Sequence, residues 1–435
     1  MRIRARTSTA SILALATGCM AASGPGSGGT GAGSGAGGKE DSGWLSDTSF
    51  EVDAHVHSWV AHAPEGEWAS LASDRELQTT LIDLQLKYAK NGTEAHDYRA
   101  NQLFDDVEIL DVRDDGGLVM IEYRAVVDMI APLQSGEEVP SLDELDPRSF
   151  EVQLPLDPVD VYAASGGACA TDAHASDYNY AYYWKPELDG CDIEKVPASV
   201  EIVEVLSRPV VFPEYDQLMR DLGDGTTGFR AALVPARGDD DPRSRFDAHR
   251  AMLEEDLGLT AEPASEGVSR YRWREGEVQI VIDLFDPTVH EFSSSYRGAL
   301  SEYQLVFYNG HSAYGTQQLL TDPEAFAPDY QILMLHSCQS YAYFVQQALR
   351  AKATADDPEG EATVDFVATG RSSYPTDSAI TLRALLRGLM DGLVAIAERR
   401  AQEAPDWISV VSVMNRQVNG ILYGVAGVRT NSWHP

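Results

Sequence analysis

Apolar residues in the second half of the chain fall into short runs that are separated by longer amphipathic stretches. Runs of this length that end at Gly, Asn, Asp or Ser are typical of buried strands, and the stretches between them have the spacing of helices. The apolar runs lie in the segments 229–236, 277–286, 303–312, 330–340 and 364–373. Helical stretches cover 245–258, 316–322, 341–352 and 378–400, and a linker is expected after residue 286. This alternation predicts a mostly parallel sheet sandwiched by helices.

The first half of the chain has a different pattern. One helical stretch covers 74–91, whereas four other segments alternate or cluster apolar residues between Gly, Pro and Asp, at 105–112, 117–130, 149–156 and 199–206. Segment 169–191 is aromatic and polar without a regular period, which indicates a long loop. We therefore predict an α/β fold for residues 206–435, preceded by a smaller β-rich α+β domain of unknown role at 45–205.

The N-terminus has the features of an export signal. Three arginines within the first six residues precede an apolar stretch at 12–16 and small residues that lead to Cys19. Signals of this kind that end at a cysteine resemble bacterial lipoprotein signals, in which the cysteine is lipidated and becomes the mature N-terminus. The resemblance implies a signal peptide at 1–18, a lipid on Cys19 and a place in the bacterial cell envelope, at the outer membrane or cell surface. The alternative is an ordinary secretory signal cleaved nearby, which also exports the protein.

The amino-acid composition leads to two further expectations, one about the N-terminal segment and one about binding partners. Residues 20–43 are nearly all Gly, Ser, Ala and Thr, so segment 19–44 is expected to be a flexible tether behind the lipid. The chain has 33 basic and 68 acidic residues, a net charge of −35, and loss of the three signal arginines leaves 30 basic residues and −38. This charge repels phosphate backbones and anionic lipid surfaces, so we expect no nucleic-acid partner and no membrane contact except the lipid.

The four cysteines differ in their sequence context. Cys169 and Cys191 lie in the same loop-rich stretch and are the natural disulfide in an oxidising compartment. Cys338 is left over once Cys19 is assigned to the lipid. An unpaired cysteine in an exported protein is either buried and inert or kept free for chemistry.

Two chemically capable residues follow consecutive predicted strands. His311 comes after the strand that ends near the Asn309–Gly310 pair, which indicates a turn, and Cys338 comes after the next strand. Functional side chains of parallel α/β sheets gather at the carboxyl ends of the strands, and neighbouring strands lie about 4.8 Å apart. We therefore expect His311 and Cys338 to meet at one edge of the sheet.

Together with segment 368–392, these two segments resemble the clan of caspases, gingipains, clostripain and separase, and they are closest in style to the bacterial CHAT-type peptidases. The resemblance extends from the strand near Phe229 to the helix near Arg400. It implies a cysteine endopeptidase in which Cys338 is the nucleophile and His311 the base and then the acid. The reaction would pass through a thioester on a protein or peptide substrate, without a metal or other cofactor.

The same resemblance implies an oxyanion hole made of the backbone amides of Cys338 and Ser312. The family usually has glycine at the position of Ser312, and Ser337 also differs from the residue common before the cysteine. These departures leave open an alternative of a different class, a catalytically inactive surface-binding lipoprotein that kept the fold.

Four residues near the predicted dyad are candidates for a specificity pocket. Arg237 and Arg371 follow predicted strands and could receive an acidic substrate side chain, whereas Asp377 could receive a basic one. His336 lies two residues before Cys338 inside the strand, so we expect a hydrogen-bonded histidine of the core or of the pocket wall rather than the base.

A second motif lies at the start of the folded part of the chain. Asp53, His55 and His57 resemble the strand-borne His-x-His of metal-dependent amidohydrolases, which makes a metal-dependent hydrolase a minor alternative. The residues that follow lack the regular alternation of strands and helices of a βα barrel, so we expect a half-exposed edge strand here. The acidic run 239–241 lacks the ligand spacing of a calcium loop and is expected to be a solvated turn.

Overall fold

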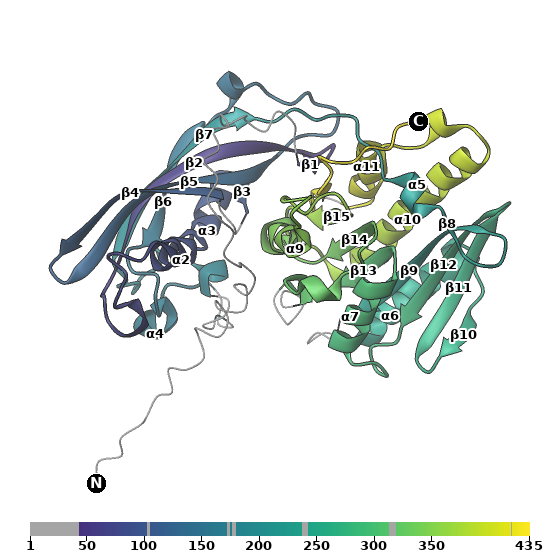
Figure 1. The fold of residues 1–435 in the computed structure, drawn as a ribbon, viewed down its shortest axis with the longest axis horizontal. Helices are drawn as coiled ribbons and strands as arrows, with labels where there is room; N and C mark the ends of the chain where they lie inside the picture. Colours follow the sequence, from purple (N-terminus) through teal and green to yellow (C-terminus); the bar gives the residue numbers. More distant parts are fainter. Residues whose placement is uncertain are drawn as a thin grey trace, which may run out of the picture. The chain divides into compact units, whose positions relative to one another are not determined.

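The computed structural model describes residues 43–101, 105–171, 175, 180–236, 242–312, 319–418 and 420–435. Residues 40–435 form one compact unit. The strands of the described residues make a six-stranded sheet and a ten-stranded sheet (Figure 1). The chain passes from the first sheet to the second after β7, which ends at Val205.

The ten-stranded sheet is mixed. Its parallel centre has the order β12–β9–β13–β14–β15, and antiparallel strands extend it at both ends. The strands are β1 Trp44–Leu45, β8 Arg220–Asp221, β9 Thr227–Pro235, β10 Glu262–Ser265, β11 Val268–Glu275, β12 Val278–Phe285, β13 Leu305–Asn309, β14 Gln331–His336, β15 Val364–Thr369 and β16 Tyr423–Ala426. The predicted parallel strands around Leu305 and Leu333 are confirmed, because β13 pairs with β14 in parallel.

Helices cover both faces of this sheet. Successive side chains of a strand point to opposite faces, so Phe307 and Met334 lie in one apolar core while Tyr308 and Leu335 lie in another. The first core is completed by α6, α10 and α11, and the second by α7 and α9. These helices are α6 Pro242–Ala251, α7 Phe292–Glu302, α9 Gln346–Lys352, α10 Ser378–Ala397 and α11 Trp407–Gln417, and the single turn α5 Tyr215–Leu218 precedes them. The fold is therefore mixed α/β.

The six-stranded sheet is antiparallel and packs its core against helices. Its order is β3–β5–β2–β7–β6, with β4 paired to β5. The strands are β2 Ser49–His62, β3 Arg99–Ala100, β4 Asp105–Asp115, β5 Leu118–Pro132, β6 Ser149–Pro155 and β7 Lys195–Val205, and the helices are α2 Arg75–Leu86, α3 Ala89–Glu94 and α4 Val161–Ser165. Burial alternates along the strands: Val56 and Ile121 are buried, whereas the residues that follow each of them, His57 and Glu122, are partly exposed. The predicted helix at 74–91 is in fact two helices, and the Asp74 side chain caps the first.

Two expectations about local structure were wrong. The segment after residue 286 is not only a linker, because it contains α7. Glu291 accepts the amides of Ser293 and Ser294 at the start of α7, and Tyr296 and Leu300 bury one side of it. Its serine-rich sequence has low helix propensity and hid this signal. The segment with Asp53 and His57 is also not an edge strand, because β2 pairs with β5 on one side and β7 on the other.

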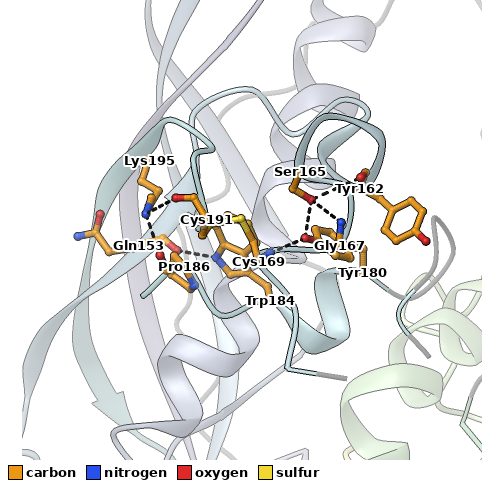
Figure 2. Close-up of a disulfide and its surroundings, with 10 residues drawn as sticks. All are labelled: Gln153, Tyr162, Ser165, Gly167, Cys169, Tyr180, Trp184, Pro186, Cys191 and Lys195. Carbon is orange, nitrogen blue, oxygen red and sulfur yellow. Dashed lines mark hydrogen bonds between the residues drawn. A yellow bond between two sulfur atoms is a disulfide. The ribbon is translucent and has the colours of Figure 1, made fainter. Parts of the chain in front are cut away.

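A disulfide joins two residues of the loop-rich segment after α4, as predicted. Cys169 and Cys191 are bonded with their α-carbons 4.8 Å apart, within the roughly 4.4–6.8 Å that a disulfide permits (Figure 2). The Tyr180 hydroxyl accepts the amide of Cys169 at 2.9 Å, and the indole of Trp184 donates to the Gln153 carbonyl at 2.9 Å. These contacts hold the short helix η4, Tyr180–Tyr183, in a defined place.

The end of the expected tether belongs to the fold. Trp44 is fully buried in β1, which pairs with β16, and its indole donates to the Ser49 hydroxyl at 2.8 Å. The rest of the expected tether, together with Cys19 and the signal segment, lies outside the described residues.

Candidate active site

Strand register brings the two predicted catalytic residues to one edge of the ten-stranded sheet. In the parallel pair β13–β14, Asn309 lies opposite His336. His311 and Cys338 each follow two residues later, so they occupy equivalent positions just beyond the carboxyl ends of β13 and β14. The chain goes from β9 to β12 on one side and then to β13 on the other, which makes the carboxyl ends of β9 and β13 a topological switch point. Open α/β sheets bind their ligands at such points.

Side-chain hydrogen bonds fix the turn that carries Cys338. The Ser340 hydroxyl donates to the Leu335 carbonyl at 2.7 Å and accepts the amide of Thr369 at 2.8 Å. The Thr369 hydroxyl in turn donates to the Ser337 carbonyl. The end of β14 is therefore tied to the end of β15.

Ser312 connects the histidine segment to the cysteine turn. Its hydroxyl donates to the carbonyl oxygen of Cys338, and the side chain is 9 % exposed. The Tyr308 hydroxyl donates to the His311 carbonyl at 2.6 Å. These bonds fix the backbone on both sides of the predicted dyad, whereas a contact between the His311 ring and the Cys338 sulfur remains a prediction.

Cys338 is a free, partly exposed thiol. Its sulfur lies 3.8 Å from the carbonyl oxygen of Ser373, and no hydrogen bond among the described residues occupies its backbone N–H. The next residue, Gln339, has a φ of 51°, a left-handed conformation that is uncommon for a residue other than glycine. Backbone strain of this kind clusters at functional sites, because the surrounding contacts must impose it.

Three buried polar atoms beside this thiol have no hydrogen-bond partner in the described part of the chain. They are the Ser337 hydroxyl, the Gln339 side-chain carbonyl and the Tyr343 hydroxyl. An unpartnered buried polar group costs about 1–3 kcal/mol, so native proteins keep few of them. A set of such groups beside a free thiol is explained if a ligand or water completes their hydrogen bonds.

Other groups that interact with Cys338 come from the helices α3, η4 and η7, Tyr341–Val345, and were missed by the sequence analysis. Lys90 of α3 lies over the rings of Tyr182 and Tyr343, with its nitrogen 4.6 and 5.4 Å from their centroids. Burial lowers the pKa of Lys90, while Glu94 and a charge on Cys338 act to raise it. The only signal in the sequence was the i,i+4 spacing of Lys90 and Glu94, which is common on any helix.

His336 is enclosed in the core rather than exposed at the edge. It is 1 % exposed, its Nε2 lies 2.9 Å from the Tyr374 carbonyl, and its Nδ1 is hydrogen-bonded to the Tyr423 hydroxyl. Burial lowers the pKa of His336 to about 4, although the Tyr374 carbonyl opposes this shift. The ring is therefore neutral at pH 7.

The remaining pocket candidates have different surroundings. The Arg371 guanidinium lies 3.6 Å from an Asp97 carboxylate oxygen, and the Arg371 carbonyl accepts the amide of Gln339, so this residue contacts the cysteine turn through its backbone. Asp377 is partly exposed just before α10. Arg237 lies outside the described residues, as does the acidic run 239–241.

Among the described residues, the alternative metal motif is not surrounded by a metal-binding arrangement. His57 Nε2 is 2.8 Å from a Glu122 carboxylate oxygen on the neighbouring strand. Asp53 is mostly buried and His55 is partly exposed on the same strand. Across the residues that the structure describes, no group of three or more His, Cys, Asp and Glu side chains is placed to hold a metal ion.

Comparison with protein-family models and with curated proteins finds no match to this chain. No helix in the described ranges is both long and apolar enough to cross a membrane. What the chain itself establishes is a mixed α/β protein with a partly parallel sheet and one disulfide, which is consistent with export to an oxidising compartment.

Proposed function

We propose that the protein is an exported, caspase-like cysteine peptidase with His311 and Cys338 as its catalytic dyad. The observation that carries the proposal is the parallel register of β13 and β14, which places these two residues equally far beyond the paired Asn309 and His336. The lipid on Cys19 and the cell-envelope location belong to the same proposal and rest on the N-terminal sequence.

The proposed reaction needs only groups of this chain and water. His311 takes the proton of the Cys338 thiol, and the thiolate attacks the carbonyl carbon of a peptide bond, whose oxyanion is met by backbone N–H groups of Cys338 and Ser312. The C–N bond then breaks as His311 gives a proton to the leaving amine. Water, deprotonated by His311, hydrolyses the thioester and releases the free thiol and a carboxylic acid.

The test measures the thiol and the reaction separately. The purified protein is treated with iodoacetamide over a range of pH, the adduct is mapped by mass spectrometry, and a peptide library is incubated with the wild type, Cys338→Ala and His311→Ala. We expect selective labelling of Cys338, slower in His311→Ala, and peptide cleavage that falls at least about 100-fold in both variants.

The alternative of a binding protein without activity is favoured by one observation, the partial burial of Cys338. Labelling of Cys338 no faster than in the urea-denatured chain, together with no cleavage of any peptide, would establish that alternative and exclude the peptidase.

A further inference from the structure

Residues of α3 reach the cysteine turn from a distant part of the sequence. The side-chain amide of Gln339 donates to a Glu94 carboxylate oxygen at 2.6 Å, and the Lys90 ammonium lies 2.7 Å from the same oxygen. Lys90 and Gln339 are 4 % and 8 % exposed. Glu94 is partly exposed, and its carboxylate accepts both the buried ammonium of Lys90 and the side-chain amide of Gln339, so one charged acceptor ties α3 to the cysteine turn.

This contact acts on the residue whose backbone is in the left-handed conformation. Gln339 is held at its side chain by Glu94 and at its amide by the Arg371 carbonyl, 3.0 Å away. Both bonds oppose relaxation of its φ of 51°. Since Cys338 directly precedes Gln339, they also fix the direction in which the thiol leaves the turn.

The contact between α3 and the cysteine turn also includes the basic side chain of Lys90. The Lys90 ammonium lies over Tyr182, whose ring stacks on that of Tyr343 with centroids 4.7 Å apart. Burial disfavours the ammonium form of Lys90, while Glu94 and a charge on the Cys338 sulfur favour it, so the nitrogen and the sulfur are close enough to interact electrostatically.

We propose that Lys90 and Glu94 are positioning residues for Cys338. Glu94 holds Gln339 and thereby the backbone of the nucleophile, and Lys90 supplies a cation that favours the thiolate. The inference rests on the proposed function for the use of that thiolate. It assigns α3, which packs against β3 and β6 of the six-stranded sheet, a role in the site at the edge of the other sheet.

The charged and titratable groups around Lys90 come from every element packed against it. They are Glu94 on α3, Arg99 on β3, Tyr182 in η4, Tyr343 in the helix η7, Tyr341–Val345, and Cys338. Arg99 opposes the charge on Lys90 and Glu94 supports it. Burial raises the pKa of both tyrosines, so they are neutral at pH 7.

The experiment compares the two members of the pair in the full chain. The rate of Cys338 alkylation by iodoacetamide is measured between pH 5 and pH 10 by intact mass, and the pH of half-maximal rate is read for each variant. Lys90→Met removes the cation and is expected to move this midpoint upward by about one unit. Glu94→Gln keeps an acceptor for Gln339 but removes the anion, and is expected to move the midpoint downward.

Opposite shifts of the two midpoints indicate an electrostatic role. Simple loosening of the cysteine turn would move the midpoints of both variants in the same direction. Lys87→Met is the matched control, because Lys87 is a partly buried lysine just before α3 whose charge partner is Asp83 and not Cys338. It should leave the midpoint unchanged, as should Lys90→Arg, which keeps the charge. If Lys90→Met does not fold, the Glu94→Gln shift and the Lys90→Arg rescue decide the question.

Unchanged midpoints in Lys90→Met and Glu94→Gln, or shifts in one direction, overturn the inference. If the wild type cleaves peptides but the midpoints of the Lys90 and Glu94 variants are unchanged, only the inference about these two residues is wrong. Opposite shifts without any cleavage support the positioning role and defeat the proposed peptidase.

Discussion

His249 shows how a single buried side chain couples the stability of this protein to pH. It is fully buried on α6 and packs edge-to-face against Phe307, with ring centroids 5.0 Å apart. Burial lowers the pKa of His249 to about 3, and a charge on His336 would lower it further. Between about pH 6.5 and pH 3 the unfolded chain therefore binds a proton that the folded chain does not, so acid favours unfolding.

Replacing this imidazole by a benzene ring removes the effect. In His249→Phe the free energy of unfolding should rise relative to the wild type as the pH falls below 6.5, by up to about 1.4 kcal/mol per pH unit for one proton. Urea unfolding at pH 8, 6 and 5 measures the difference. If the two proteins lose stability in parallel over this range, His249 is not the responsible group.

At the level of the elements, the hydroxyl of Ser340 joins the ends of β14 and β15. Ser340→Ala leaves the Leu335 carbonyl and the Thr369 amide without this partner in the core. The free energy of unfolding should fall by about 2 kcal/mol, since each lost buried partner costs about 1–3 kcal/mol. Chemical denaturation measures it, and labelling of Cys338 reports whether the turn has loosened.

Ser301→Ala is the matched control for this change. The Ser301 hydroxyl also donates to a backbone carbonyl, that of Gly298 at 3.0 Å, but it is exposed on α7. Water replaces the lost bond there, so the variant should stay within about 0.5 kcal/mol of the wild type. Equal losses in the two variants would show that Ser340 has no special structural role.

Across the whole molecule, Arg429 connects segments from both ends of the folded chain. Its guanidinium lies 3.0 Å from Glu361 and 3.6 Å from Glu51, and Glu51 also accepts the amides of Gly43 and Trp44, at 2.6 and 3.1 Å. Burial works against the charge on Arg429, but the two carboxylates outweigh it and raise its pKa. Both carboxylates are 3 % exposed, so they depend on this cation.

Arg429→Met should therefore lower the free energy of unfolding by about 3 kcal/mol at pH 7, because it leaves buried carboxylates without their cation. The double variant Arg429→Met/Glu361→Gln should recover part of this loss, since it removes one of the two charges. Thermal and urea unfolding of the three proteins measures both effects. A double variant less stable than Arg429→Met would show that the Glu361 charge has another function.

Local sequence patterns were sufficient for the elements that bury a regular apolar face. The apolar run before Asn309 and Gly310 predicted β13, and the long periodic stretch at 378–400 predicted α10, because each pattern is set by the geometry of a single element. The pairing of Cys169 with Cys191 was predictable from their common loop and the predicted export signal. The antiparallel strands β10 and β11 were missed because β10 is exposed throughout and β11 carries several charged residues among its few buried ones.

Only the tertiary structure decided what surrounds Cys338. The sequence placed His311 and Cys338 after consecutive strands, but Gln339 and Glu94 are 245 positions apart, and no local pattern relates them. Likewise, the alternation of Asp53, His55 and His57 is the same for an edge strand and for the central strand that β2 proved to be. Periodicity records which side chains of an element are buried, whereas the identity of the partner depends on how the elements pack, which is a property of the whole chain.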